Sequence, residues 1–338
     1  MEILPRISVV IPIRNEERFI AQTIAYLQNQ DYPPDRFEII VVDGDSDDGT
    51  VGIVEQIAAA DSRVRLLHNP KRLSSAARNA GAREATGEIV TYVDGHTYID
   101  NDQLLRSVAA CMAEEGLDVL SRPQFLETPE NNHFQRAVAL ARRSPVGHGL
   151  DSTIYTERDL RVNPTSSGAS YKKTVIETVG YFDENFDACE DVEFNFRVAQ
   201  AGYESFTSMR LAVYYYPRES IGRLFHQMKR YGVGRLRLAR KHPGSLGLGT
   251  LIPFLFTAGV PILAALSFVH RWFFYLFLLA VVPYALMILL ASTAVAIKAG
   301  WGYLPQLPLI FVTIHTGLGW GFLVELLRTL AWRGAGNS

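Results

Sequence analysis

Three long stretches without a charged residue dominate the last third of this chain of 338 residues. They cover residues 246–269, 272–297 and 299–324. Each is longer than the roughly 20 residues that an α-helix needs to cross the hydrocarbon core of a bilayer. A core helix of a soluble protein would keep a polar face, and none of the three stretches has one. The sequence therefore predicts an all-α transmembrane segment of three helices over residues 246–330.

A basic segment precedes these stretches. Residues 218–242 contain eight Lys and Arg but a single Glu, interleaved with Leu, Phe, Met and Tyr. This mixture is typical of an amphipathic helix on an anionic membrane surface, with an ordinary solvated helix as the alternative. Positive charge beside the first span places this segment in the cytosol. Three crossings would then put Arg328 and Arg333 outside the cell. One of the stretches could instead be re-entrant, so that it enters and leaves the membrane on the same side.

The distribution of charge divides the chain into three expected parts. These are a cytosolic domain over residues 1–217, an amphipathic membrane-interface segment over 218–245, and the transmembrane domain over 246–330. The net charge of −2 at pH 7 argues against a nucleic-acid-binding protein, which normally carries a strong basic excess. The two cysteines form neither a disulfide framework nor a metal-binding spacing, which suits a reducing compartment.

Short apolar runs alternate with segments of helical periodicity over residues 7–114. The runs are typical of buried strands and the segments between them of helices. Such alternation predicts an α/β fold with right-handed crossovers and a mostly parallel sheet. Ligands bind to these sheets at the carboxyl ends of the strands. The expected strands are 7–13, 37–42, 64–67 and 88–93, and the expected helices include 51–60, 74–84 and 101–114.

Polar loops follow the first, second and fourth of these strands, at residues 12–16, 43–50 and 94–96. Their carboxylates can accept a hydrogen bond from a base, bind ribose hydroxyls or hold a divalent cation. Sugar transfer from a nucleotide diphosphate needs all three, because the leaving diphosphate has to be neutralised. One acidic loop alone could serve as a helix cap or a turn. Three at the same edge of a sheet favour a sugar-nucleotide site.

Several spaced motifs resemble the inverting glycosyltransferases of family 2, which have the GT-A fold. They are VVIPIRNEE, VVDGDSDDGT, YVDGH, GASYKKTVIETVGYFDENF and CEDVEFNFRVAQAGY, and the resemblance covers about residues 5–235. The combination of DGH with C-terminal spans is most similar to exopolysaccharide glucosyltransferases of the succinoglycan type. The resemblance implies a Rossmann-like sheet followed by amphipathic interface helices and an all-α transmembrane segment.

The resemblance also implies a donor site. It assigns the uridine and the diphosphate to Pro12, Asn15, Glu16, Asp43, Asp45 and Arg78. Which of the two aspartates faces the uracil stays open. Asp94 and His96 take the first and last positions of the metal-binding Asp-x-Asp motif, so Asp94 serves both the donor and the metal. A histidine at the last position favours Mn²⁺ over Mg²⁺, while a solvent-facing turn residue is the alternative for His96.

The acceptor side is implied by two later motifs. Asp191, beside Glu190, matches the general base that takes a proton from the acceptor hydroxyl, while a helix-dipole partner is the structural alternative. Gln227, Arg230 and Tyr231 match Gln-x-x-Arg-Trp, a motif that meets the acceptor sugar and the diphosphate, with Tyr in place of Trp. A phosphate acceptor needs no base, so Asp191 favours a hydroxyl on a lipid-linked sugar.

We therefore expect a non-processive inverting transferase that moves one sugar, glucose by resemblance, from a UDP-sugar to an undecaprenyl-diphosphate-linked saccharide. The protein would be a multi-pass protein of the cytoplasmic membrane with its catalytic domain in the cytosol, and oligomerisation remains open. Two rival hypotheses are a polyprenyl-phosphate sugar synthase and a nucleotide-binding scaffold without catalysis.

Overall fold

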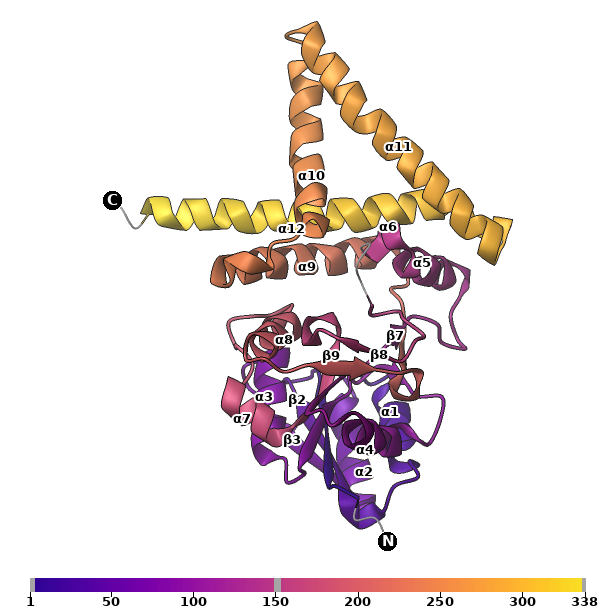
Figure 1. Ribbon diagram of the computed structural model, residues 1–338, viewed down its shortest axis with the longest axis vertical. Coiled ribbons are helices and arrows are strands. Elements are labelled where there is room, and N and C mark those ends of the chain that lie inside the picture. The colour runs from indigo at the N-terminus through magenta and orange to yellow at the C-terminus, as the bar shows by residue number, and fades with distance from the viewer. Residues whose placement is uncertain (1–3, 149–152, 336–338) are drawn as a thin grey trace. The chain divides into compact units, whose positions relative to one another are not determined.

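The computed structural model describes residues 4–148 and 153–335, and it divides the chain into two compact units (Figure 1). The first unit consists of Met1–Thr128 and Thr153–Tyr216, and the second of Pro129–Ser152 and Pro217–Ser338. Each unit is therefore assembled from two separate parts of the chain. Pro129–Ser152 belongs to the second unit, whereas the sequence places it within the domain expected over residues 1–217.

A mixed eight-stranded sheet forms the centre of the first unit. In sheet order its strands are β3 (Val64–His68), β2 (Phe37–Asp43), β1 (Ile7–Ile13), β4 (Ile89–Tyr92), β9 (Gly168–Lys172), β6 (Val119–Ser121), β10 (Ser205–Thr207) and β8 (Leu160–Val162). The first four pair in parallel, as the alternation of strands and helices predicts. β9 is antiparallel to both of its neighbours, β4 and β6. The mostly parallel sheet is confirmed.

Among the described residues, a second sheet and six helices complete the first unit. The sheet contains β5 (Thr97–Tyr98), β11 (Val213–Tyr215) and β7 (Gln124–Phe125). The helices are α1 (Ile20–Gln28), α2 (Thr50–Ala60), α3 (Ser74–Glu84), α4 (Leu104–Glu115), α7 (Lys173–Val179) and α8 (Glu190–Gln200). Short 3₁₀ turns lie at Pro34–Arg36, Pro164–Ser166 and Met209–Leu211.

The central strands are buried on both faces because side chains alternate along them. Val9 and Ile11 of β1 join the core that α1 and α4 cover, whereas Val10 joins the core on the opposite face. Gly81 of α3 lies so close to β1 that a Cβ there would come within 2.3 Å of a methyl carbon of Val10. This close packing fixes the height of α3, and with it the position of Arg78.

The described elements of the second unit are helices. They are α5 (His133–Arg143), α6 (Pro145–His148), α9 (Ile221–Lys241), α10 (Leu248–Leu266), α11 (Arg271–Ala299) and α12 (Leu307–Ala335), with short 3₁₀ turns at Pro243–Ser245 and Trp301–Tyr303. A reciprocal cap begins α5, because the Asn132 and Gln135 side chains each accept from the other's backbone N–H. Gln135 also donates to the Pro217 carbonyl at 3.0 Å, which joins the two chain segments of this unit.

Apolar contacts among α5, α9, α11 and α12 form the core of the second unit. Met228, Ile288, Phe311 and Ile314 are buried there. The expected amphipathic helix exists as α9, and the three uncharged stretches form α10, α11 and α12. Among the described residues two helices are long and apolar enough to cross a membrane, Arg271–Ala299 and Leu307–Ala331. They indicate membrane association.

Candidate active site

The loops after β1 and β2 are tied together at the carboxyl edge of the sheet. Asn15 adopts the left-handed conformation, with φ of 57°. Its side-chain oxygen accepts from the Asp47 N–H at 3.0 Å, and its own N–H donates to Ser46 Oγ at 2.8 Å. The Gly44 N–H also donates to the Ile13 carbonyl at 2.8 Å, directly after Pro12 in the chain. Two of the predicted donor loops therefore form one continuous edge.

Asp43 and Asp45 lie in different surroundings on this edge. Asp43 is buried at the end of β2, where its carboxylate accepts from the N–H and the hydroxyl of Ser46. Asp45 is only partly buried, has φ of 61°, and forms an ion pair with Arg72. The hydrogen bond and charge of Arg72 hold the pKa of Asp45 below its ordinary value. Both stay candidates for the uracil contact.

Arg78 joins the fourth-strand loop to the start of α8. Its Nη2 donates to Asp94 Oδ1 at 2.9 Å, and its Nε lies 3.6 Å from Glu190 Oε1. The guanidinium also lies over the rings of Tyr92 and Phe182. Burial alone would lower the pKa of Arg78, but Asp94 and Glu190 outweigh it and raise the pKa above its ordinary value. The cation is therefore permanent and rigidly held.

The Asp94-Gly95-His96 turn is held against the first loop. A Cβ at Gly95 would lie 2.6 Å from a methyl carbon of Ile13, so a side chain there would push the turn away from β1. His96 Nδ1 lies 2.8 Å from Glu16 Oε1. A carboxylate in this position orients an imidazole and raises its basicity as a metal ligand. Glu16, which was assigned to the donor site, therefore also contacts His96 of the predicted metal motif.

The chemistry of Asp94 and His96 fits a divalent cation that shares its coordination with phosphate oxygens. No group of three or more His, Cys, Asp or Glu side chains forms a metal site within residues 4–148 and 153–335. Catalytic cations that bind through one or two side chains take their remaining ligands from substrate phosphates and water. One carboxylate and one imidazole could hold such a cation, and oxygens of the donor diphosphate would complete its coordination.

Glu190 and Asp191 begin α8, as predicted. Burial raises the pKa of Glu190 above its ordinary value, Asp191 adds to this, and Arg78 opposes it. Asp191 is half-buried and its Oδ1 accepts from the Val192 N–H at 2.8 Å. Cys189, which precedes the helix, has φ of 61° and turns the chain sharply into it. Asp191 thus lies at a helix N-terminus, whose partial positive charge stabilises a carboxylate.

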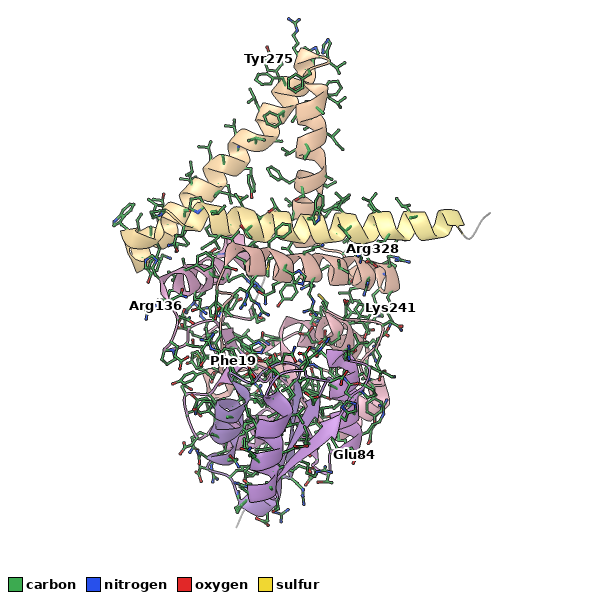
Figure 2. All side chains as sticks on the ribbon, turned by 180° about the vertical axis from the view of Figure 1, so that it is seen from behind. Phe19, Glu84, Arg136, Lys241, Tyr275 and Arg328 are labelled. Atoms are coloured by element: carbon green, nitrogen blue, oxygen red, sulfur yellow. The ribbon has the colours of Figure 1, made fainter. Side chains whose placement is uncertain are left out.

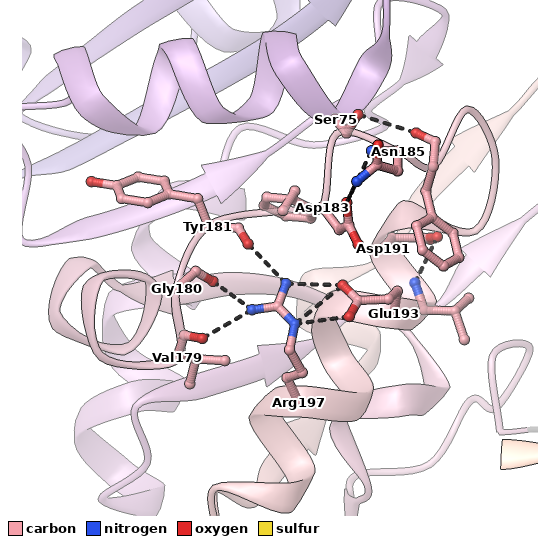
Figure 3. Close-up of polar contacts among 12 residues, drawn as sticks. Ser75, Val179, Gly180, Tyr181, Asp183, Asn185, Asp191, Glu193 and Arg197 are labelled. Atoms are coloured by element: carbon pink, nitrogen blue, oxygen red, sulfur yellow. Dashed lines mark hydrogen bonds and ion pairs between the residues drawn. The ribbon is translucent and has the colours of Figure 1, made fainter. Parts of the chain in front are cut away.

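A buried ion pair anchors α8 to the loop before it (Figure 3). Arg197 forms a two-pronged contact with Glu193, with N–O distances of 2.9 to 3.2 Å. The same guanidinium donates to the carbonyls of Val179, Gly180 and Tyr181. The Glu193 side chain is 0% exposed, so both charges are compensated within the protein. The network holds the helix that carries Asp191.

Arg122 is a second side chain that the motifs did not reveal. It follows β6, is 2% exposed, and donates to the Tyr92 carbonyl at 2.8 Å and to Thr91 Oγ1 at 2.7 Å. Burial lowers its pKa, while Tyr215 and Asp94 oppose the shift. Arg122 therefore supports the end of β4, immediately before Asp94. A basic residue two positions after the apolar pair 119–120 was the available signal.

Gln227, Arg230 and Tyr231 belong to the second unit. They lie on one face of α9, and Gln227 Nε2 donates to the Tyr231 hydroxyl at 3.4 Å. The guanidinium of Arg142 lies 5.9 Å from the centre of the Tyr231 ring. The structure brings these three together with each other, and their role toward an acceptor stays a prediction.

Comparison with known proteins agrees with the geometry of the first unit. The sequence profile of glycosyl transferase family 2 matches residues 8–176. The succinoglycan biosynthesis protein ExoA of Rhizobium meliloti is 31% identical over 325 residues, which cover 94% of each chain. This chain belongs to glycosyl transferase family 2. It is a glycosyltransferase, and the predicted family is confirmed.

Two further relatives extend this comparison. The dolichyl N-acetyl-α-D-glucosaminyl phosphate 3-β-D-2,3-diacetamido-2,3-dideoxy-β-D-glucuronosyltransferase of Methanococcus voltae is 24% identical, over 95% of this chain and 97% of its own. The solved mannosyltransferase PcManGT of Pyrobaculum calidifontis, in complex with GDP-mannose and Mn²⁺, has a TM-score of 0.62 and 20% identity. That similarity covers 96% of this chain and 88% of PcManGT, and it confirms the GT-A fold.

Proposed function

We propose that this glycosyltransferase moves one sugar, glucose, from a UDP-sugar to a saccharide carried on a polyprenyl diphosphate, with inversion at the anomeric carbon. The observation that carries the proposal is the Arg78 bridge. One buried cation contacts both Asp94 of the metal motif and Glu190 beside Asp191. The residues proposed for the donor metal and for the acceptor base are therefore held within one network.

The donor would bind along the edge formed by the first two loops. Pro12, Asn15 and either Asp43 or Asp45 would contact the uridine, and Arg78 would face the diphosphate. Asp94 and His96 would hold a divalent cation that neutralises the leaving diphosphate. Mn²⁺ is proposed over Mg²⁺ because Mg²⁺ prefers an all-oxygen octahedron, whereas imidazole suits softer cations. PcManGT was solved in complex with Mn²⁺, which supports this choice.

Asp191 would act as general base on the acceptor. It would take the proton of the acceptor hydroxyl while that oxygen attacks the anomeric carbon from the face opposite the diphosphate. The C–O bond to the diphosphate breaks as the new glycosidic bond forms, and the configuration inverts. Asp191 lies in the first turn of α8 and interacts electrostatically with the cation of Arg78, which also contacts Asp94 of the metal motif.

A lipid-linked acceptor is supported by the relatives and by the apolar helices. One relative is named for the biosynthesis of succinoglycan, and the other for transfer to a sugar on dolichyl phosphate. We propose that Gln227, Arg230 and Tyr231 of α9, with Glu190, meet the acceptor sugar and its diphosphate. The protein would then work at the cytoplasmic face of the cytoplasmic membrane as a multi-pass protein.

The test measures transfer of radiolabel from UDP- and GDP-sugars into the lipid fraction of a membrane extract, with Mn²⁺ or Mg²⁺. We expect UDP-glucose with Mn²⁺ to be used best. Asp191→Asn should lower kcat about 10²- to 10⁴-fold and leave UDP binding unchanged. Glu177→Gln, which changes an exposed acid on α7, is the matched control.

Two outcomes contradict the proposal. Nearly intact turnover by Asp191→Asn would indicate an acceptor that is already a nucleophile, such as a polyprenyl phosphate. Binding of UDP-sugars without hydrolysis or transfer by the wild-type protein would indicate a scaffold without catalysis.

A further inference from the structure

The backbones of α9 and α12 touch through glycines. A Cβ at Gly321 of α12 would lie 2.0 Å from the Lys229 carbonyl oxygen of α9. A Cβ at Gly232 of α9 would lie 2.1 Å from the Leu318 carbonyl oxygen of α12. No side chain fits at either position without separating the helices. The two helices are therefore packed at the closest distance that backbones allow.

Polar contacts continue this pairing toward the C-terminus. Arg237 Nε donates to Glu325 Oε1 at 3.0 Å, and Arg240 Nη1 donates to Thr329 Oγ1 at 2.8 Å. The partner numbers rise together along both helices, so α9 and α12 run parallel and side by side, as Figure 1 shows. From Gly317 to Thr329 the paired length is roughly 18 Å at 1.5 Å per residue.

α9 cannot cross a bilayer. Ile221–Lys241 contains seven Lys and Arg and no acidic residue. Each such charge costs about 2.5–3.5 kcal/mol at the centre of a membrane-inserted helix. α12 is joined to α9 over about half of its length, and a helix joined in this way shares the orientation of its partner. Its apolar composition therefore does not make α12 a membrane span.

The two faces of α12 differ in what covers them. Phe311, Ile314 and Phe322 are buried on the face toward the core of the unit. The opposite face exposes a stripe of four apolar side chains, which are 45% to 57% exposed. They are Leu309, Trp320, Leu327 and Leu330. At about 100° per residue these four fall within roughly 80° of one another. A helix in the membrane interface buries such a stripe at the boundary between headgroups and acyl chains.

α10 and α11 form a hairpin that stands away from α12 on the side opposite α9 (Figures 1 and 2). With 19 and 29 residues they are roughly 28 and 43 Å long, and the hydrocarbon core is about 30 Å thick. Trp272 and Tyr275 lie near the tip, where aromatic side chains commonly meet the far interface. Arg271 and Lys298 bracket α11, and residues 272–297 between them carry no charge.

We propose that the bilayer receives only the α10–α11 hairpin as two crossings, while α12 lies along its cytoplasmic interface and α9 lies parallel to α12 on the side away from the hydrocarbon core. The end of α12 then lies on the cytoplasmic side of the membrane, and the hairpin tip on the opposite side. Arg240, Lys241 and Arg328 all remain on the side of the anionic headgroups. The hydropathy of the sequence predicts three crossings. Because α12 is paired with α9, it does not form the third of these crossings.

Three single cysteines test this topology in the full chain, because Cys111 and Cys189 are buried and react little with an impermeant maleimide. The variants are Phe268→Cys at the tip, Gly302→Cys between α11 and α12, and a cysteine added after Ser338. In intact cells we expect labelling of the tip alone. In sealed inside-out vesicles we expect labelling of the other two. The unsubstituted chain is the control for background.

Two labelling patterns overturn the proposal. Labelling of both Phe268→Cys and the C-terminal cysteine in intact cells would show three crossings. Labelling of Gly302→Cys alone in intact cells would show that α11 and α12 cross and α10 does not. The measurement does not depend on turnover, so it stands apart from the test of the proposed function.

Discussion

The two units of this protein carry opposite charge. The first contains 18 Lys and Arg against 31 Asp and Glu, and the second 15 against 4. The near-neutral total conceals this division. An acidic unit suits a site that gathers a metal cation around a sugar nucleotide, whereas a basic unit suits anionic lipid headgroups and a lipid diphosphate. Substitutions in the two units should therefore affect different substrates.

The largest expected effect comes from Arg78 of the first unit. Arg78→Met leaves Asp94 and Glu190 without their cation, and breaking a buried charge pair costs about 3–5 kcal/mol. We expect loss of transfer and a lower unfolding midpoint by far-ultraviolet circular dichroism. Arg72→Met removes an exposed ion pair to Asp45 and should leave stability almost unchanged. Equal effects of the two substitutions would contradict the Arg78 bridge.

The Glu16 contact to His96 predicts a smaller effect on metal binding. Glu16→Gln should weaken binding of Mn²⁺ in the presence of UDP by roughly 10- to 100-fold, because the imidazole loses its orienting carboxylate. Electron paramagnetic resonance of free Mn²⁺ measures this without turnover. Glu17→Gln is the control, since Glu17 Oε2 accepts instead from the Gly49 N–H. An unchanged affinity of Glu16→Gln for Mn²⁺ would indicate that His96 is a turn residue and not a metal ligand.

Arg230 of the second unit should affect only the acceptor. Losing a charge-assisted hydrogen bond to a lipid diphosphate costs about 1.5 kcal/mol, so Arg230→Gln should raise the acceptor KM about tenfold. The KM for the UDP-sugar should not change. Arg223→Gln, on the same helix, pairs with Glu219 and serves as control. A rise in the KM for the UDP-sugar would contradict the proposal that the second unit binds only the acceptor.

The smallest effect concerns the pH dependence of the second unit. Burial, with Arg142 and Arg235, lowers the pKa of His148 to about 3. Below its ordinary pKa of 6.5 the unfolded chain binds a proton that the folded chain does not, so stability is lost as pH falls from 6.5 toward 3. His148→Gln should reduce this loss between pH 6.5 and 5.5, by about 1 kcal/mol.

Tryptophan fluorescence can follow this change, because all four Trp lie in the second unit. Identical slopes of unfolding midpoint against pH for wild type and His148→Gln would contradict the shifted pKa.

The sequence predicts the parallel half of the first unit well because its signals are local. The helix expected at 74–84 coincides with α3, and the strand at 7–13 with β1. Parallel strands end at one edge, so Asp94 could be expected near Asn15 and Asp43 without knowledge of any contact. The placement of β9 between β4 and β6 could not be predicted, because its partners are distant in the sequence.

Other features depend on partners that a pattern does not reveal. The bounds of α5 could not be predicted, since half of its buried residues are Ala and the charged Arg142 is also among them. Arg122 and Arg197 support the site by donating to backbone carbonyls. These carbonyls come near them only in the folded chain, so the sequence pattern does not reveal the contacts. The hydropathy of α12 resembles that of α11, and the glycine and polar contacts of α12 with α9 distinguish the two helices.

The discontinuity of the second unit imposes an order on biosynthesis. About 80 residues separate the end of α5 from the start of α9, and a ribosome that adds 5–20 residues per second needs roughly 4–16 s for them. The last strands of the first unit emerge within this interval. The first unit can therefore fold before Ala137 and Val138 of α5 meet their packing partners α9, α11 and α12, which are synthesised later.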